Sequence, residues 1–261
     1  MNPFIRIQPA LDTPTLRSFV ERLPAAFNQG EGELIFNGRN VIRRFEVEGV
    51  TLVVKHYRRP NIFQKIAGIF SHRYKGQKAF INATKLQEAG FSTPAPIAVL
   101  ELRNALGATV DAYYACAPCD LPPINPLITP DGHPSLEDHE SFLEQLAYFI
   151  ASFHQRGIMH GDLNVSNIYF TLSPEGKYHF TLIDINRMSF RKDGQPLSRR
   201  RSLKDLMRIT SVIEMQMRIA IKYIQLRGWD LLPALREEMD YKQKLNNHFA
   251  RNAKWKKMRK K

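Results

Sequence analysis

The stretch that decides the fold is "HGDLNVSNIYF", residues 160–170, together with "LIDINR", residues 182–187. Both stretches carry carboxylates and amides where a buried segment would continue with apolar residues. Asp162 and Asn167 lie in the first stretch and Asp184 lies in the second. Polar groups placed inside apolar runs need a reason, because burying them costs free energy unless they are paired.

A β-hairpin is predicted between the two stretches, since "NIYFTL" and "YHFTLID" are rich in β-branched and aromatic residues and are joined by "SPEGK". A hairpin returns the chain near its start, so Asp184 is expected close to Asn167. Magnesium-dependent phosphoryl transfer needs one carboxylate as a base, and an amide and a second carboxylate as hard oxygen ligands. We therefore expect Asp162 to be the catalytic base, and Asn167 and Asp184 to bind Mg²⁺.

The first half of the chain is predicted to be rich in strands. Residues 33–57 alternate in polarity and are punctuated by Asn37-Gly38 and Glu48-Gly49, which indicates three antiparallel strands joined by two tight turns. The other elements predicted for this half are helices over 14–27 and 72–89 and strands over 97–103 and 111–117.

The second half is predicted to be mostly helical. It follows a proline-rich hinge and loop over 118–134. A long amphipathic helix then runs to about Arg156, with a capping box at Ser135 and Asp138 and Gly157 at its end. Two more helices are predicted over 201–227 and 229–250. The predicted fold class is α+β, with a small antiparallel-sheet lobe carrying one main helix (1–117), a larger mostly helical lobe (118–250) and a basic tail (251–261).

The charge of the chain narrows the choice of partners. The net charge is +13, and the segment 251–261 carries seven basic residues and no acidic one. Such charge suits nucleic acid, anionic lipid headgroups or a polyanionic small molecule, although a solvated tail that aids solubility explains the segment equally well. Charged residues and prolines interrupt the first thirty residues, and no apolar run approaches the ~18 residues of a membrane span, so we expect a cytoplasmic protein.

The polar stretches resemble a known family. His160, Asp162 and Asn167 match the H-x-D-x-x-x-x-N catalytic loop of the protein-kinase-like superfamily, and Asp184 matches its metal-binding aspartate. More specifically, "HGDLNVSNI", "LIDINR" and "GFSTPAP" (90–96) resemble the lipopolysaccharide kinase family, which includes the 3-deoxy-octulosonic acid kinases. The resemblance implies a bilobal protein-kinase-like fold.

The resemblance also implies a nucleotide site in the first lobe. Lys55, which ends the apolar strand "TLVVK", matches the lysine that holds the nucleotide phosphates. The sequence lacks a G-x-G-x-x-G motif before this lysine, so a plain hairpin with Gly38 and with Arg39 or Asn40 is expected to cover the phosphates.

The helix over 72–89 departs from the kinase pattern, because its middle carries no glutamate to pair with the strand lysine. A partly buried ammonium needs a counter-charge or several acceptors. We therefore expect Lys55 to pair with Asp184 in the absence of nucleotide, with Asn82 as a second contact.

Three further residues are expected to support the site. His160 is expected to be a packed structural histidine rather than a proton donor. Two roles are open for Asn164: it either orients Asp162 or a substrate hydroxyl, or it braces the loop through a hydrogen bond. Two roles are also open for Arg187, which are to contact the substrate and to brace the metal-binding loop.

The function expected from these observations is transfer of a phosphoryl group from ATP, with Mg²⁺, to an alcohol group. The expected acceptor is a sugar of the lipopolysaccharide core or a related anionic glycolipid, with peripheral contact at the inner face of the cytoplasmic membrane. The alternatives are a kinase for a protein or another small molecule, and a catalytically weak pseudokinase that serves as an interaction module. Nucleic acid is the least favoured partner, because charge alone suggests it.

Overall fold

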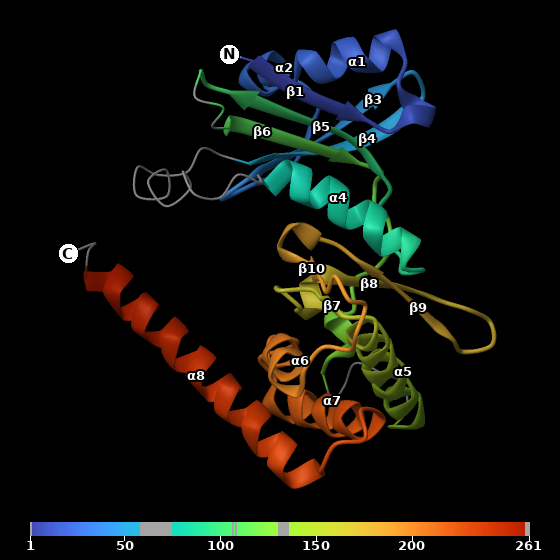
Figure 1. Cartoon of the computed structure of the whole chain (residues 1–261), viewed down its shortest axis with the longest axis vertical. Helices are drawn as coiled ribbons and strands as arrows, with labels where there is room; N and C mark the ends of the chain where they lie inside the picture. The colour runs from blue at the N-terminus through green and yellow to red at the C-terminus, as the bar shows by residue number, and fades with distance from the viewer. Residues whose placement is uncertain (1, 58–74, 106, 108, 130–135, 259–261) are drawn as a thin grey trace. The chain divides into compact units, whose positions relative to one another are not determined.

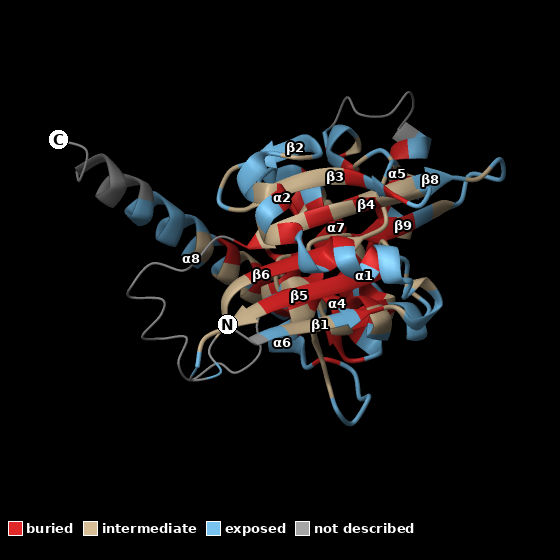
Figure 2. Ribbon diagram, turned by 90° about the horizontal axis from the view of Figure 1, so that it is seen from above, coloured by how far each residue is buried: buried red, intermediate tan, exposed pale blue. Residues whose placement is uncertain are grey.

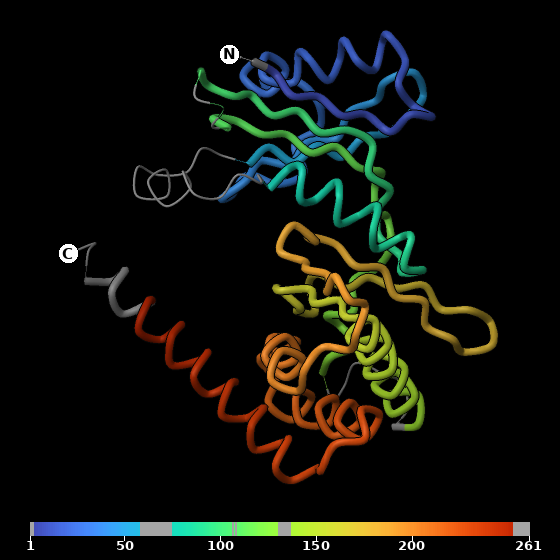
Figure 3. The backbone as a smooth tube through the Cα atoms, in the orientation of Figure 1, coloured from blue at the N-terminus to red at the C-terminus, as the bar shows by residue number. Residues whose placement is uncertain are grey.

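The computed structural model describes residues 2–57, 75–105, 107, 109–129 and 136–258. The chain divides into two compact units, and the backbone of each can be followed in Figure 3. Unit 1 comprises Met1–Asp120 and Asp184–Arg187, and unit 2 comprises Leu121–Ile183 and Met188–Lys261.

Unit 1 is built on one six-stranded antiparallel sheet with the strand order β1-β5-β6-β4-β3-β2 (Figure 1). The three strands and two turns predicted within 33–57 are confirmed, as are the two later strands. At the second turn Glu48 and Gly49 both have positive φ angles, of 52° and 76°, as a tight hairpin turn requires. The strands are β1 (Asn2–Ile7), β2 (Glu33–Asn37), β3 (Val41–Val47), β4 (Val50–Tyr57), β5 (Pro96–Arg103) and β6 (Thr109–Cys116).

Helices cover both faces of this sheet. After the short 3₁₀ helix η1 (Pro9–Leu11), α1 (Pro14–Glu21) and α2 (Leu23–Gln29) cover one face, and α4 (Lys75–Glu88) covers the other (Figure 1). Two apolar clusters result, and their residues form much of the buried interior of unit 1 in Figure 2. The second cluster packs Tyr57 of β4 against Ala79 and Phe80 of α4, so this face of β4 points at α4.

Two expectations for unit 1 need correction. A single helix over 14–27 is wrong, because the chain breaks at Arg22, which ends α1 and begins α2. Pro24 lies in the first turn of α2, where its missing N–H is tolerated, whereas a continuous helix would need that group as a donor. The strand β1 was not predicted. The helix predicted over 72–89 is confirmed as α4 from Lys75, and its first three residues lie outside the described part of the chain.

Unit 2 is mostly helical. Its helix α5 packs against α7, and Phe142, Leu146 and Phe153 of α5 are fully buried. The predicted hairpin is confirmed as β8 paired with β9. The elements of unit 2 are η2 (Asn125–Leu127), α5 (Leu136–Gln155), β7 (Ile158–Met159), η3 (Val165–Asn167), β8 (Ile168–Leu172), β9 (Tyr178–Leu182), β10 (Ser189–Phe190), α6 (Arg199–Leu206), α7 (Ile213–Leu226) and α8 (Leu231–Met258). No helix within the described ranges is long and apolar enough to cross a membrane.

The single helix predicted over 201–227 is wrong, because the chain forms α6 and α7 with a break over 207–212. The buried side chain of Gln216 compensates for the break: its amide donates to the Leu206 carbonyl and its oxygen accepts from the Thr210 N–H. The capping box predicted at Ser135 lies outside the described residues. The helix predicted over 229–250 is α8, which continues to Met258.

The first turns of α8 attach to α6 and α7 through buried polar groups. Glu238 is 0% exposed, and its Oε1 accepts a 2.6 Å hydrogen bond from the Gln216 amide. Its Oε2 is buried with no hydrogen-bond partner in the described part of unit 2. Lys242, one turn later, donates to the carbonyls of Met207 and Thr210. Burial raises the pKa of Glu238 to about 7, against the opposing effects of Gln216 and Lys242.

This buried carboxyl predicts a pH-dependent stability. Between pH 4.5, the ordinary pKa, and about 7, folded Glu238 holds a proton that the unfolded chain releases. The free energy of unfolding should therefore fall as pH rises through this window, by up to about 3 kcal/mol from this group. The variant Glu238→Gln should lose that part of the pH dependence and be the more stable protein at pH 8, as measured by urea unfolding at several pH values. Parallel pH profiles of the two proteins would contradict the assignment.

Candidate active site

The predicted catalytic loop of unit 2 is built around His160, which is 0% exposed. Its Nδ1 accepts a hydrogen bond from the Asp162 N–H at 3.3 Å, and its Nε2 lies 3.1 Å from the Ile183 carbonyl oxygen. Because Nδ1 is an acceptor, Nε2 carries the proton and donates it to the carbonyl. The imidazole therefore joins the loop to the strand end that follows β9, and both of its nitrogens are occupied by backbone groups.

Two asparagines hold the backbone carbonyl of Asp162. Asn164 donates to it at 3.2 Å and Asn167 donates at 2.9 Å. The Asn164 oxygen also accepts from the Ser166 N–H and caps η3. Asn167 is 8% exposed, and its own carbonyl accepts a 3.0 Å bond from the Ile183 N–H. The loop thus fixes the Asp162 main chain through side-chain amides, and one of these amides belongs to Asn164.

A residue that sequence reasoning missed, Asp205 of α6, anchors the same loop. Its carboxylate accepts 2.8 Å hydrogen bonds from the N–H groups of both His160 and Gly161, and lies 3.2 Å from His154 Nε2. Burial opposes ionisation of Asp205, but these donors outweigh it and the pKa of Asp205 is lowered. A carboxylate in the otherwise amphipathic segment "RSLKDLM" was the available sequence signal.

In unit 1, the predicted ion pair between Lys55 and Asp184 is confirmed. Lys55 Nζ lies 2.6 Å from Asp184 Oδ1, with the two side chains 16% and 36% exposed. The ammonium also lies 5.5 Å from the centre of the Tyr57 ring, two residues further along β4. This arrangement places a half-buried lysine between a carboxylate and an aromatic face.

Asp184 occupies an unusual backbone conformation. Its φ angle is 52°, in the left-handed region that non-glycine residues seldom adopt and that is found at functional sites. Asn186, in η4 (Ile185–Arg187), donates to the same Oδ1 at 2.8 Å. Burial raises the pKa of the Tyr57 hydroxyl well above its usual range, with the Asp184 charge adding to the effect. Among the described residues, no donor binds the second oxygen, Oδ2.

Asn82 connects α4 to this loop. It is 8% exposed, and its amide donates a 2.8 Å hydrogen bond to the Ile185 carbonyl. In the expected kinase pattern this helix supplies a glutamate to the strand lysine, whereas here Asn82 makes a neutral hydrogen bond to the backbone. Asn82 was expected as a second contact of Lys55, and the sequence gave no signal that it would bind a backbone carbonyl.

The remaining predicted residues lie in the β2–β3 turn and at the end of η4. The Gly38 N–H donates to the Asn40 carbonyl at 3.0 Å. A Cβ atom at Gly38 would lie 2.6 Å from the ring of Phe36, so a larger residue here would displace this ring. Arg187 is exposed at the end of η4, three residues after Asp184.

Each unit offers one side-chain oxygen of a kind that magnesium binds. Asn167 binds Asp162 through its amide nitrogen, and within the described residues nothing donates to its Oδ1. Asp184 uses Oδ1 for Lys55 and Asn186, which leaves Oδ2. Amide and carboxylate oxygens are the hard ligands that Mg²⁺ takes, together with water and phosphate oxygens.

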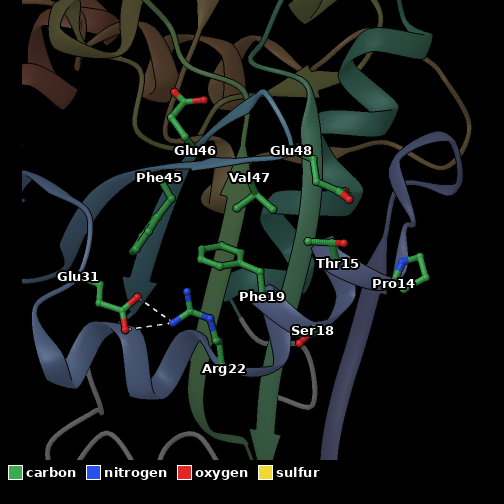
Figure 4. Close-up of a pocket in the computed structure, with 10 residues that line it drawn as sticks. All are labelled: Pro14, Thr15, Ser18, Phe19, Arg22, Glu31, Phe45, Glu46, Val47 and Glu48. Carbon is green, nitrogen blue, oxygen red and sulfur yellow. Dashed lines mark hydrogen bonds and ion pairs between the residues drawn. The ribbon is translucent and has the colours of Figure 1, made fainter.

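Unit 1 also contains a pocket of about 770 Å³ between α1, α2 and the β3–β4 hairpin (Figure 4). Phe19 and Phe45 line its interior, and Arg22 Nη1 donates to both carboxylate oxygens of Glu31, at 2.8 and 3.0 Å. Glu48 at the rim accepts a 2.6 Å bond from Thr13, so the charged groups of this pocket are engaged with each other and with the fold. The pocket does not include the candidate site residues.

A solved structure shares this fold. The structure described as WaaP in complex with acyl carrier protein aligns with a TM-score of 0.59 and 17% sequence identity, over 95% of this chain and 98% of that one. At this identity the likeness concerns the fold, and the expected α+β, bilobal protein-kinase-like fold is confirmed. No curated protein matches the chain in sequence.

The sequence itself matches a family model. Residues 29–225 match the model described as the lipopolysaccharide kinase (Kdo/WaaP) family. The match covers Lys55, the loop from His160 to Asn167, and Asp184, whose geometry is given above. The chain therefore belongs to the lipopolysaccharide kinase (Kdo/WaaP) family.

Proposed function

We propose that this protein transfers a phosphoryl group from ATP, with Mg²⁺, to a hydroxyl of a lipopolysaccharide core sugar or a related glycolipid. Family membership supports a kinase of this class. The observation that carries the proposal is the 2.6 Å pair between Lys55 and Asp184, because it prepares a phosphate-binding lysine and a metal-binding carboxylate together.

Each site residue has a proposed role. Asp162 accepts the proton of the attacking hydroxyl, and the bonds to its carbonyl from Asn164 and Asn167 hold it in place. Asn167 and Asp184 bind the metal, which when bound neutralises charge on the phosphate oxygens. Chain connectivity supports this pairing, since the Ile183 N–H bonds the Asn167 carbonyl and Asp184 is the next residue.

Lys55 is proposed to hold the nucleotide phosphates. Asp184 would hold the metal, and Lys55 would then pair with the nucleotide phosphates instead of with this carboxylate. The sheet lobe, 1–117, would cover the nucleotide, with Gly38 and Asn40 in its covering hairpin, and the helical lobe, 118–250, would supply the catalytic loop. Arg187 then lies beside the metal-binding carboxylate in sequence, where it can brace the loop or contact substrate.

The catalytic residues do not discriminate between acceptors, and the missing helix glutamate favours a weak pseudokinase as the second candidate. Transfer of radiolabelled γ-phosphate from ATP to lipopolysaccharide precursors, to a generic protein substrate and to free sugars separates these cases. Label in the lipopolysaccharide precursor supports the proposal. Binding of Mg-ATP without turnover on any acceptor would favour the pseudokinase.

The proposed roles predict two different defects. Asp162→Ala should lower turnover by about 10²- to 10⁴-fold, the usual contribution of a general base, while Mg-ATP still binds. Asp184→Asn should abolish transfer and weaken binding of Mg-ATP, because it removes a charged metal ligand. Single-turnover assays and calorimetric titration with Mg-ATP measure the two effects.

A matched control for these variants is Asp240→Ala, which removes an exposed carboxylate on α8. It should keep wild-type turnover, and all three variants should remain folded under the assay conditions. Full activity of Asp184→Asn in magnesium would show that the metal assignment is wrong.

We also propose that the basic end of α8 binds anionic membranes. The residues from Gln243 to Asn252 are exposed, apart from the half-buried Leu245. The segment from Arg251 onward adds seven basic residues and Trp255, which is a residue type common at membrane interfaces. This placement would bring the enzyme to the inner face of the cytoplasmic membrane.

Truncation after Ala250 tests this role. Each basic residue near an anionic surface contributes about 1 kcal/mol, so the loss should weaken binding to vesicles containing phosphatidylglycerol by at least about tenfold. Binding to neutral phosphatidylcholine vesicles should be weak for both proteins. The melting temperature should stay nearly unchanged, and a large drop would show that the segment stabilises the fold instead.

A further inference from the structure

A group of charged side chains in unit 1 extends beyond the Lys55–Asp184 pair. Lys75, the first residue of α4, lies close enough to Arg39, Lys55, Asp184 and Arg187 for their charges to act on its ammonium group. The group thus contains four basic residues and one carboxylate. Lys75 was not expected to take part in the site.

The fold explains why Lys75 and Lys55 lie on the same side of the sheet. Lys55 is two residues before Tyr57 on β4, and side chains two apart share a face of the sheet. Tyr57 packs against α4, so Lys55 also points to the α4 side. At the start of α4, a Cβ atom at Gly76 would lie 3.0 Å from Val99 and 3.5 Å from the Tyr113 carbonyl of β6. The helix start is therefore pressed onto β6, the strand that pairs with β4 at Lys55.

The other two basic residues arrive from neighbouring elements. Arg39 lies in the turn between β2 and β3. Ile42, three residues after Arg39, is the residue of β3 that pairs in register with Lys55. Arg187 ends η4, which α4 holds through the bond from Asn82 to Ile185. A turn, a strand end, a helix start and a loop thus bring their charges together at one side of the sheet.

This group carries more positive than negative charge. Asp184 is already paired with Lys55, and no ion pair is found for Arg39 or Lys75 within the described ranges. Partial burial lowers the pKa of Lys75, and the charges of Arg39, Arg187 and Lys55 lower it further, while Asp184 opposes them. Like charges held close together cost free energy that a bound anion would offset. The chemistry points to a ligand with several negative charges.

The covering hairpin does not offer its glycine amide to a phosphate. Glycine-rich loops bind phosphates through free backbone N–H groups. Here the Gly38 N–H is taken by the Asn40 carbonyl, and the ring of Phe36 fills the space beside Gly38. The turn therefore offers side chains rather than this amide to a phosphate.

We infer that Lys75 is a second lysine that binds the nucleotide polyphosphate, and that with Arg39 it replaces the backbone cradle of a glycine-rich loop. This inference rests on the proposed ATP-dependent function. It assigns phosphate recognition to long, charged side chains, whose contribution depends on the number of phosphates and on salt. Lys75 and Arg39 are assigned no contact with the base or the ribose of the nucleotide.

The test compares Lys75→Gln with Lys85→Gln, which removes an exposed charge at the other end of the same helix. Binding of ATP, ADP, AMP and adenosine to the full-length chain is measured by calorimetry in magnesium. Lys75→Gln should lower the affinity for ATP by about tenfold or more and the affinity for ADP by less. The affinity for adenosine should be unchanged. Lys85→Gln should bind all four ligands as the wild type does.

Two further variants separate charge from structure. Lys75→Arg keeps the charge and should retain most of the ATP affinity, and Lys75→Gln combined with Arg39→Gln should lose more and show a shallower salt dependence. Wild-type ATP affinity in Lys75→Gln, or an equal loss in Lys75→Arg, would overturn the inference. Absence of ATP binding in the wild-type protein would instead overturn the proposed function, and this inference with it.

Discussion

The ion pair between Lys55 and Asp184 is the interaction on which the candidate site in unit 1 depends. A mostly buried ammonium loses hydration, and a carboxylate at 2.6 Å offsets that loss. The same carboxylate accepts a hydrogen bond from Asn186, and the backbone of Asp184 has a φ angle of 52°. The strained loop conformation and the charge on the sheet therefore stabilise each other. Any ligand that takes Asp184 away from Lys55 changes both at once.

The helix α4 contributes to this arrangement without a charge of its own. Where a kinase helix offers a glutamate to the strand lysine, Asn82 binds the backbone carbonyl of Ile185. The helix still fixes the loop, but it adds no negative charge beside Lys55. Beyond the paired Lys55 and Asp184, Lys75 and Arg39 add positive charge, which suits the binding of a polyphosphate.

The sequence allowed much of this to be predicted where local rules apply. The turns at Asn37-Gly38 and Glu48-Gly49 fixed the strands around them, and a lone lysine without a glutamate led to the expected pair with Asp184. The breaks at Arg22 and over 207–212 were not predictable from periodicity, because the apolar pattern continues across them. In the second break, Gln216 satisfies backbone groups that a helix would have paired.

Asp205 shows why the remainder of the site stays hidden in the sequence. Its function lies in three donors, from His154, His160 and Gly161, that are more than forty residues away along the chain. Local pattern carries no trace of such contacts. Through these contacts, the buried carboxylate of Asp205 pairs with backbone N–H groups of the predicted catalytic loop. Unit 2 thus holds its loop by completed hydrogen bonds, whereas unit 1 keeps excess charge. The first arrangement fixes the main chain of Asp162, and the second is suited to bind an anion.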